Sequence, residues 1–249
     1  MKKNFRFCIL FILIFLFNTL IVKAEREIKY VDSEIRNGII YSKNEKIPYN
    51  GLIKDYYKNG NVKIEWTIVN GAQNGVAKSY YEDGTLKSDS IFKNNKKTGI
   101  EKMYSFDGKL VAEVPYKDEV RDGIEKQYSK NGKVIIEISF KNGIEDGTKK
   151  SFYKNGNLKY SLGLKNGIEE GVFKQYYENG VLEIEAFYKN GKLEGLRRDY
   201  YKSGKLEVEG LQKNGKPDGW TYVYNEDGSL KREIFFVEGK AYEKDNKKK

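Results

Sequence analysis

Hydrophobic and polar side chains alternate along most of the chain with a period of two. Successive side chains of a β-strand point to opposite faces of a sheet, so this pattern predicts strands with one apolar face. The clearest stretches carry these apolar residues: Val62, Ile64, Trp66 and Ile68; Val134, Ile136, Ile138 and Phe140; and Leu182, Ile184, Ala186 and Tyr188.

Two series of glycines divide these strands into repeats of 24 residues without any insertion. A fixed period of this length is typical of repeat proteins, in which each unit packs on its neighbours. The pattern predicts an all-β fold: an elongated antiparallel sheet of about eight tandem 24-residue β-hairpin repeats over residues 51–242. The first series is Gly51, Gly75, Gly99, Gly123, Gly147, Gly171, Gly195 and Gly219, and the second is Gly60, Gly84, Gly108, Gly132, Gly156, Gly180, Gly204 and Gly228.

The turns of each hairpin are predicted from the residues beside glycine. Asn or Asp precedes the second glycine in seven of the eight repeats. Asn-Gly and Asp-Gly favour two-residue type I′ turns, because both residues tolerate positive φ. A second Asn-Gly turn, such as Asn70-Gly71, leads into the next hairpin. Asn95 and Glu119 replace the glycine of this second turn, so these two connections are expected to be less regular.

A two-residue turn at Asn59-Gly60 also fixes the register, and it places Lys54 opposite Glu65. We expect such pairs to form two parallel charge ladders on one face and to be structural, not catalytic, because each acid has its own basic partner. The aromatic residues five places after each first glycine, seven tyrosines and Phe152, are interpreted as a stacking ladder, with a carbohydrate- or peptide-binding strip as the alternative. The same count gives these further pairs: Lys78 with Asp89, Lys102 with Glu113, Lys126 with Glu137, Lys174 with Glu185, and Arg198 with Glu209.

The two ends of the repeat array have different sequences. Residues 25–50 resemble a degenerate capping hairpin, in which residues 39–41 pair with residues 47–49 across a turn at 42–45. Pro48 cannot donate to a sheet and suits an edge. The eighth repeat is interpreted as the other cap, and residues 243–249 form a basic tail. The chain is therefore predicted to be one elongated domain.

The first 24 residues are typical of a signal peptide. Lys2, Lys3 and Arg6 precede an apolar run that is too short to span a membrane comfortably, and Ala24 follows as a small residue suited to cleavage. A cleaved Sec signal is favoured over a permanent anchor. The mature protein is expected to begin at Glu25 and to reside in the periplasm, at the cell surface or outside the cell.

Composition excludes several kinds of chemistry. The chain has no histidine, and its one cysteine, Cys8, lies within the predicted signal. Histidine-dependent catalysis and intrachain disulfides are therefore absent. The formal charge is +10, from 46 basic and 36 acidic residues. Because basic and acidic residues alternate along the chain, the charge argues against nucleic acid as a partner. No catalytic residue, cofactor or metal site is predicted.

Residues 38–242 resemble the MORN-variant repeat of bacterial proteins such as the YwqK-type antitoxin family. The strings that carry the resemblance are GLIKDYYKNGNVKIEW, GVFKQYYENGVLEIEAFYKNGKLEG and GLRRDYYKSGKLEVEG. The resemblance implies a non-enzymatic scaffold that binds another protein, whose identity is open. One alternative is an antitoxin or immunity protein, although an export signal conflicts with neutralising a cytoplasmic toxin. A second alternative is weak binding to an anionic phospholipid surface.

A few aromatic residues depart from the repeat pattern and are candidates for function. Trp66 is interpreted as core, and Trp220 and Tyr222 as packing residues of the final repeat. Phe173 and Tyr177 are the candidate contact for a protein partner, because aromatic anchors carry much interface energy. The residues equivalent to Phe173 in the other repeats are Ile53, Ala77, Glu101, Glu125, Lys149, Arg197 and Thr221.

Overall fold

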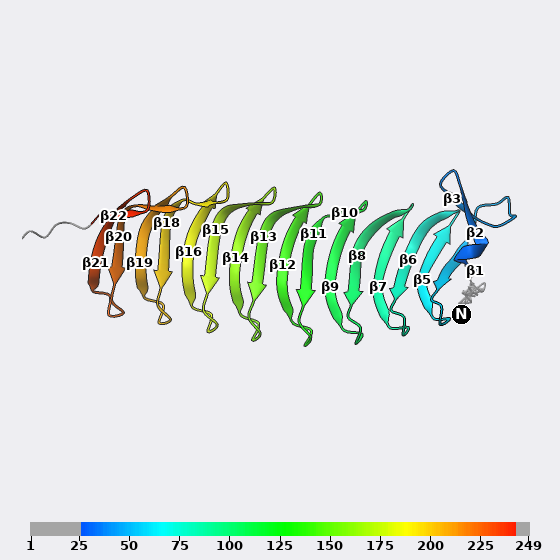
Figure 1. Cartoon of the computed structure of the whole chain (residues 1–249), viewed down its shortest axis with the longest axis horizontal. Coiled ribbons are helices and arrows are strands. Elements are labelled where there is room, and N and C mark those ends of the chain that lie inside the picture. The colour runs from blue at the N-terminus through cyan, green and yellow to red at the C-terminus, as the bar shows by residue number, and fades with distance from the viewer. Residues whose placement is uncertain (1–25, 243–249) are drawn as a thin grey trace, which may run out of the picture.

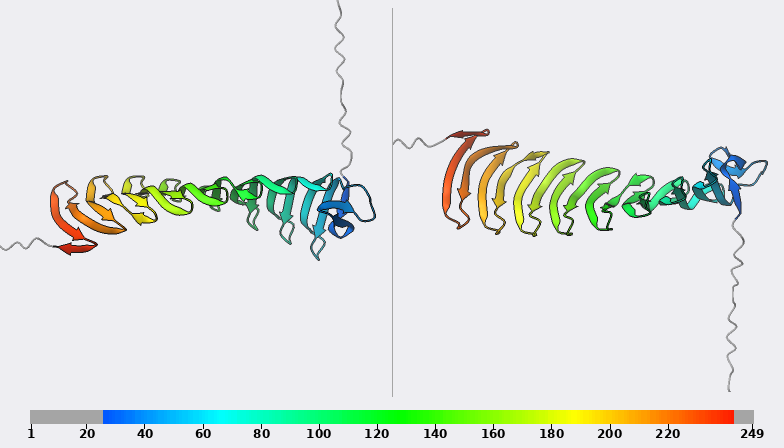
Figure 2. Two further views of the ribbon diagram at one scale, coloured as in Figure 1. Left: turned by 90° about the horizontal axis from the view of Figure 1, so that it is seen from above. Right: turned by 60° about the horizontal axis from the view of Figure 1, so that its bottom comes forward.

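The computed structural model describes residues 26–242, which form one long, twisted, single-layered sheet of 20 strands and a separate two-stranded hairpin (Figures 1 and 2). Consecutive strands of the repeats pair antiparallel, as predicted. No helix of residues 26–242 is long and apolar enough to cross a membrane. The predicted signal peptide and the basic tail lie outside the described residues.

Each of the eight repeats contributes two long strands. The short strands β10 and β17 pair with the strand before them and lead into β11 and β18. The strands after the N-terminal cap are β4 (Gly51–Tyr56), β5 (Val62–Val69), β6 (Ala72–Tyr80), β7 (Leu86–Lys93), β8 (Lys96–Tyr104), β9 (Leu110–Lys117), β10 (Val120–Arg121), β11 (Gly123–Tyr128), β12 (Val134–Lys141), β13 (Ile144–Phe152), β14 (Leu158–Lys165), β15 (Ile168–Tyr176), β16 (Leu182–Lys189), β17 (Lys192–Leu193), β18 (Gly195–Tyr200), β19 (Leu206–Lys213), β20 (Lys216–Tyr224), β21 (Leu230–Val237) and β22 (Lys240–Tyr242).

The turn within each hairpin differs from the predicted type I′ turn. In the first repeat, the Tyr57 amide donates to the Asn61 carbonyl at 2.9 Å, so three residues form the loop. The left-handed φ of 90° belongs to Gly60, and Asn59 does not share it. The prediction was wrong because an Asn-Gly pair also fits a three-residue loop that ends in a left-handed glycine, which matches the twist of the strands equally well.

The predicted register is nevertheless confirmed in all six pairs of basic and acidic residues. A bulge accounts for this agreement. Tyr56 pairs with Val62 and Asp55 pairs with Ile64, so Lys63 is an extra residue on the second strand. It compensates for the extra loop residue, and Lys54 lies opposite Glu65 as expected.

The connections at Asn95 and Glu119 are as regular as the others, contrary to prediction. Asp118 and Glu119 have φ values of 49° and 72°, close to the 51° and 74° of Asn70 and Gly71. The surroundings enforce this conformation, because the second residue of each turn donates its amide to a carbonyl of the preceding repeat. The Glu119 amide donates to the Lys97 carbonyl at 2.8 Å. Glu119 therefore adopts a left-handed backbone that favours glycine.

We expect Glu119→Gly to stabilise the protein by about 0.5 to 1 kcal/mol, because it removes the cost of left-handed backbone at a residue with a Cβ. Gly215→Glu is the matched reverse substitution. Gly215 occupies the equivalent position with φ of 81°, and a Cβ there would meet no atom within 4 Å. Gly215→Glu should lower the free energy of unfolding by a similar amount. Denaturant midpoints measure both changes, and a Glu119→Gly protein no more stable than wild type would contradict this reasoning.

The N-terminal cap covers the first edge of the sheet, but its strands differ from the prediction. It comprises β1 (Glu27–Lys29), a short 3-10 turn (Tyr30–Asp32), β2 (Ser33–Arg36) and β3 (Ile39–Ser42). β1 pairs parallel with β4, while β2 and β3 form a separate hairpin. The predicted pairing of residues 39–41 with 47–49 is confirmed in part: the Tyr49 amide donates to the Ile40 carbonyl at 2.9 Å, and the Glu45 amide donates to the Ser42 carbonyl at 3.0 Å within the predicted turn. Residues 47–49 form no strand, and β3 pairs instead with β2 across a turn at Asn37-Gly38, with φ of 54° and 79°.

The core lies on one face of the sheet, which we call the core face. At the cap, Tyr49, Ile53 and Ile68 are buried, and Ile28, Ile40 and Trp66 pack against them, which confirms Trp66 as a core residue. Along the repeats the same face buries further apolar residues, including Ala77, Val114, Ile138 and Ala186. A single layer thus builds a thin core by packing side chains between neighbouring strands.

Candidate interaction surface

The face opposite the core carries the predicted charges, and we call it the charged face. The two expected ladders are in fact one row, because the acidic strand of each hairpin also pairs with the basic strand of the next. Glu65, for example, lies between Lys54 and Lys78. The row runs through Lys54, Glu65, Lys78, Asp89, Lys102, Glu113, Lys126, Glu137, Lys150, Ser161, Lys174, Glu185, Arg198, Glu209, Tyr222 and Glu233.

This charge row forms close ion pairs only in places. The Lys174 Nζ lies 3.1 Å from Glu185, and the Arg198 Nε lies 3.3 Å from Glu209. Ser161 and Tyr222 interrupt the alternation. Exposed pairs of this kind contribute less than about 1 kcal/mol each, so the row mainly fixes the register and leaves the surface nearly neutral over short distances.

Tyrosines form a second row on the charged face, nearer the loops within the hairpins. Three of their hydroxyls donate to carboxylates of the charge row: Tyr128 to Glu113 at 2.7 Å, Tyr104 to Asp89 at 3.4 Å and Tyr224 to Glu209 at 3.5 Å. Burial raises the pKa of the Tyr128 hydroxyl to about 12, and its bond to Glu113 adds to the rise. These hydrogen bonds tie three tyrosines of the row to the neighbouring charge row.

We expect Tyr128 to be among the last tyrosines to ionise. Its pKa in the fold is above the value of about 10 of an unfolded tyrosine, so its stabilising effect is complete below pH 10 and is lost as the pH rises towards 12. A difference titration against Tyr128→Phe isolates this hydroxyl by its ultraviolet absorbance. Glu113→Gln should lower the pKa only in part, because burial remains. A Tyr128 that ionises near pH 10 would contradict the arrangement.

A third row on the charged face consists of exposed apolar side chains, and we call it the apolar row. It lies on the side of the charge row away from the tyrosines and consists of cross-strand pairs. Ser139, Thr148 and Gly163 divide it into two patches. The exposed residues of the first patch are Val76, Ile91, Ile100 and Ile124, and those of the second are Val172, Phe187, Leu196, Leu211, Trp220 and Phe235.

The sequence contained a signal for the apolar row that our interpretation missed. Six of the eight residues that directly follow the first glycine are Leu, Val or Ile. The alternation of the second strand predicts only the core face, and these residues lie on the opposite face. Trp220, expected to be a packing residue of the cap, belongs to this row and lies 5.1 Å from Phe235 between ring centroids.

The two candidate contact residues lie in different environments. Phe173 is half-buried on the core face, with its ring centroid 5.9 Å from that of Tyr188 and 6.4 Å from that of Tyr160. Tyr177 follows the end of β15, and its hydroxyl donates to the Tyr200 carbonyl of the next repeat at 2.7 Å. Tyr57, Tyr81, Tyr153 and Tyr201 make the equivalent bond. A contact with a partner stays a prediction for Phe173 and Tyr177.

Several carboxylates outside the charge row have structural contacts. Those that precede a first glycine accept a hydrogen bond from the turn 20 residues later, as Glu170 does from the Asn190 amide at 2.8 Å. On the core face, buried Glu125 accepts from Arg121 at 3.1 Å and from Gln127 at 3.0 Å. Residues 26–242 hold no cluster of three or more His, Cys, Asp or Glu side chains able to bind a metal ion.

The chain matches the family described as "MORN repeat variant" over seven consecutive stretches: residues 49–70, 73–94, 97–118, 121–142, 145–166, 169–190 and 193–214. No curated protein matches the chain. The eighth hairpin, β20–β21, lies beyond the matched stretches and has the same antiparallel pairing as the others.

Proposed function

The chain belongs to the MORN repeat variant family, and from this premise we propose that it is a non-enzymatic scaffold that binds another protein through the apolar row of its charged face. The exposed apolar row is the single observation that carries the proposal. Soluble proteins rarely leave contiguous apolar side chains in water unless these bind a partner.

The arrangement of the charged face supports a protein as the partner. Apolar centres flanked by polar side chains are typical of protein interfaces. The second patch contains Trp220 beside Phe235, and tryptophan often contributes much of the binding energy of an interface. The alternating signs of the charge row oppose strong attraction to an anionic membrane, because each lysine has an acid beside it.

The repetition of the surface also supports a scaffold over an enzyme. Active sites need one place with distinct acids, bases or nucleophiles. Here the carboxylates with described contacts recur in equivalent positions and hydrogen-bond lysines, arginines, tyrosines or turn amides. We further propose that the protein acts after export, so its partner belongs to the cell envelope or lies outside the producing cell. A secreted toxin is one such partner.

The proposal is tested by capture with the immobilised protein from the envelope fraction of the producing organism. The wild type is compared with Leu196→Ser/Leu211→Ser, which alters the second patch, and with Met103→Ser on the core face. Leu196 and Met103 are equally exposed, at 39%. A protein recovered by the wild type and by Met103→Ser, but lost with the double variant, supports the proposal. Binding to anionic vesicles that survives in the double variant would favour a lipid surface instead.

A further inference from the structure

A hollow of about 590 Å³ lies at the turn between β19 and β20, and we call it the lysine hollow. Lys192 of β17, Lys213 at the end of β19 and Lys216 at the start of β20 line it. The Gly215 amide donates to the Leu193 carbonyl at 2.9 Å, so the turn lies against the strand that carries Lys192. Three lysines from two consecutive repeats therefore border one hollow.

The lysine hollow adjoins the second patch of the apolar row. Alternate side chains of a strand share a face, so Leu211 and Lys213 of β19 both lie on the charged face. On β21, Phe235 of the second patch and Val237 of the hollow are related in the same way. Two residues of a strand span about 7 Å. One segment of a bound protein can therefore contact the patch and the hollow together.

The positive charges of the hollow are poorly neutralised within the fold. Lys213 and Lys216 lie directly opposite each other, and like charges in this arrangement destabilise a sheet. Among residues 26–242, Lys192 and Lys216 form no ion pair. Lys213 forms one ion pair, with Asp218 at the long distance of 3.9 Å.

Two carboxylates belong to the lining, and Asn214 and Val237 complete it. Asp218 accepts a hydrogen bond from the Glu238 amide at 3.1 Å, which holds it against the next turn. The Glu238 side chain is the second carboxylate, and it is exposed. Glu194, outside the lining, accepts from the Asn214 amide at 2.9 Å. Three lysines against two carboxylates leave the hollow with an excess of one positive charge.

The fold does not require lysine at these positions. Two repeats earlier, the equivalent hollow of about 580 Å³ has Ile144 in place of Lys192, and Ile168 takes the place of Lys216. The turn is nevertheless the same. The φ values are 52° and 81° at Asn214-Gly215, and they are 52° and 78° at the equivalent turn. The change from isoleucine to lysine therefore points to recognition, not to folding.

We propose that the lysine hollow binds a carboxylate of the partner protein that docks on the second patch. The inference rests on the proposed function, which supplies the apolar contact, and it adds the chemistry of the partner: an apolar segment that carries Asp or Glu beside it. The bound carboxylate reduces the repulsion between Lys213 and Lys216. Complementary charge of this kind speeds association and excludes partners of the wrong sign.

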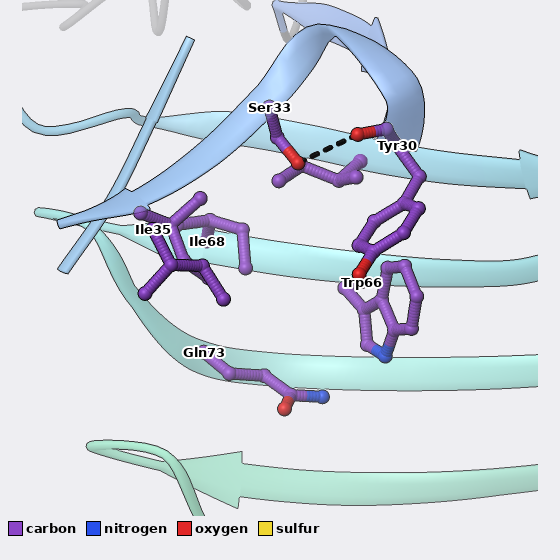
Figure 3. Close-up of a pocket in the computed structure, with 8 residues that line it drawn as sticks. Tyr30, Ser33, Ile35, Trp66, Ile68 and Gln73 are labelled. Atoms are coloured by element: carbon purple, nitrogen blue, oxygen red, sulfur yellow. Dashed lines mark hydrogen bonds between the residues drawn. The ribbon is translucent and has the colours of Figure 1, made fainter. Parts of the chain in front are cut away.

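A carboxylate is favoured over a phosphate because the hollow is only weakly positive. The second negative charge of a phosphate would be repelled by Asp218 and Glu238. The other end of the molecule offers no such selection by charge. There a cavity of about 210 Å³ lies beneath the N-terminal cap, and the described residues that line it, Trp66 among them, are all uncharged (Figure 3).

The test compares two pentapeptides with blocked ends, Phe-Leu-Val-Glu-Glu and Phe-Leu-Val-Gln-Gln, as ligands of the proposed mature protein. Both have the same apolar half, and only the first carries carboxylates. At an ionic strength of about 0.02 M the acidic peptide should have a dissociation constant about threefold to tenfold lower, the effect of one or two exposed ion pairs. At about 0.5 M salt the difference should fall below about twofold, because salt screens exposed charges. Amide shifts in NMR titrations measure both constants.

Lys192→Gln/Lys216→Gln tests the lysines themselves. It should bring the two dissociation constants within about twofold of each other, while the thermal midpoint stays equal or rises, because exposed charges without ion pairs are removed. Lys141→Gln/Lys165→Gln is the matched control, since these exposed lysines line the equivalent hollow. The control should keep the preference for the acidic peptide.

Leu196→Ser/Leu211→Ser separates this inference from the proposed function. If the wild type binds both peptides equally and this variant weakens both, the proposed function stands and the lysine hollow is overturned. If the acidic preference depends on the lysines but this variant binds as well as the wild type, the lysine hollow is supported and docking on the apolar row is contradicted.

Three further results would overturn the inference. The first is an acidic preference that Lys192→Gln/Lys216→Gln leaves unchanged. The second is a lack of binding by either peptide. The third is binding of phosphatidylserine vesicles that depends on the same two lysines while neither peptide binds, because the hollow would then recognise a lipid headgroup.

Discussion

Leu196→Ser/Leu211→Ser should lower affinity for the captured partner at least about 100-fold, which is tenfold or more for each side chain of the pair. The two residues face each other across β18 and β19 at the centre of the second patch of the apolar row. Loss of their side chains removes apolar contact area at the centre of the patch, where water is most fully excluded from an interface. Calorimetry or surface binding with the purified partner measures the change.

The same double variant should remain folded. Both side chains are substantially exposed, so their loss should cost no more than about 1 kcal/mol each in unfolding free energy. Met103→Ser, equally exposed on the core face, should change partner affinity less than about threefold. An affinity loss of equal size in Met103→Ser would show that the effect does not depend on the face, and it would contradict the proposed surface.

Gly51→Ala should destabilise the cap and the first repeat by about 3 kcal/mol or more, because it combines backbone strain with a collision. Gly51 has φ of 142°, and a Cβ there would clash with the Arg26 carbonyl and lie 2.8 Å from the Tyr49 hydroxyl. Tyr49 is fully buried and donates to the carbonyls of Arg26 at 2.9 Å and Leu52 at 3.0 Å. The substitution therefore disturbs the contact that seats β1 against β4.

Gly195→Ala is the matched control for this prediction. Gly195 is equivalent to Gly51 in the seventh repeat and has φ of 77°, but a Cβ there would meet no atom within 4 Å. Gly195→Ala should lower the free energy of unfolding by only about 1 kcal/mol, because it introduces backbone strain without a collision. In a repeat protein the ends can unfold separately, so Trp66 fluorescence should report an earlier transition than far-ultraviolet circular dichroism in Gly51→Ala. Equal losses of unfolding free energy in Gly51→Ala and Gly195→Ala would show that the collision has no effect.

The sequence was sufficient for the architecture because three signals agreed. The period of the glycines, the alternation of apolar residues and the opposite charges at Lys54 and Glu65 all specify the same hairpins and the same register. The sequence did not determine the type of turn within each hairpin. An Asn-Gly pair fits both a two-residue and a three-residue loop, and the bulge at Lys63 leaves the ladder unchanged in either case.

The ends and the surface were harder to predict for physical reasons. The cap breaks the repeat period, so the sequence predicted the contact of residue 40 with residue 49 but not the β2–β3 hairpin around Asn37-Gly38. The departure of Phe173 from the repeat pattern marked it as exceptional, but Tyr160 and Tyr188 pack against it on the core face. The apolar row follows the repeat pattern, so a search for exceptions could not find it.

The central claim, that a partner docks on the apolar row, is tested most directly by cysteine protection. The chain's one cysteine, Cys8, lies in the predicted signal peptide, so a single cysteine can be introduced at each chosen position of the proposed mature protein. With the purified partner bound, alkylation should slow at least about tenfold for Val172→Cys, Leu196→Cys and Leu211→Cys, and it should be unchanged for Met103→Cys on the opposite face. Protection at Met103→Cys with free reaction along the apolar row would contradict the account.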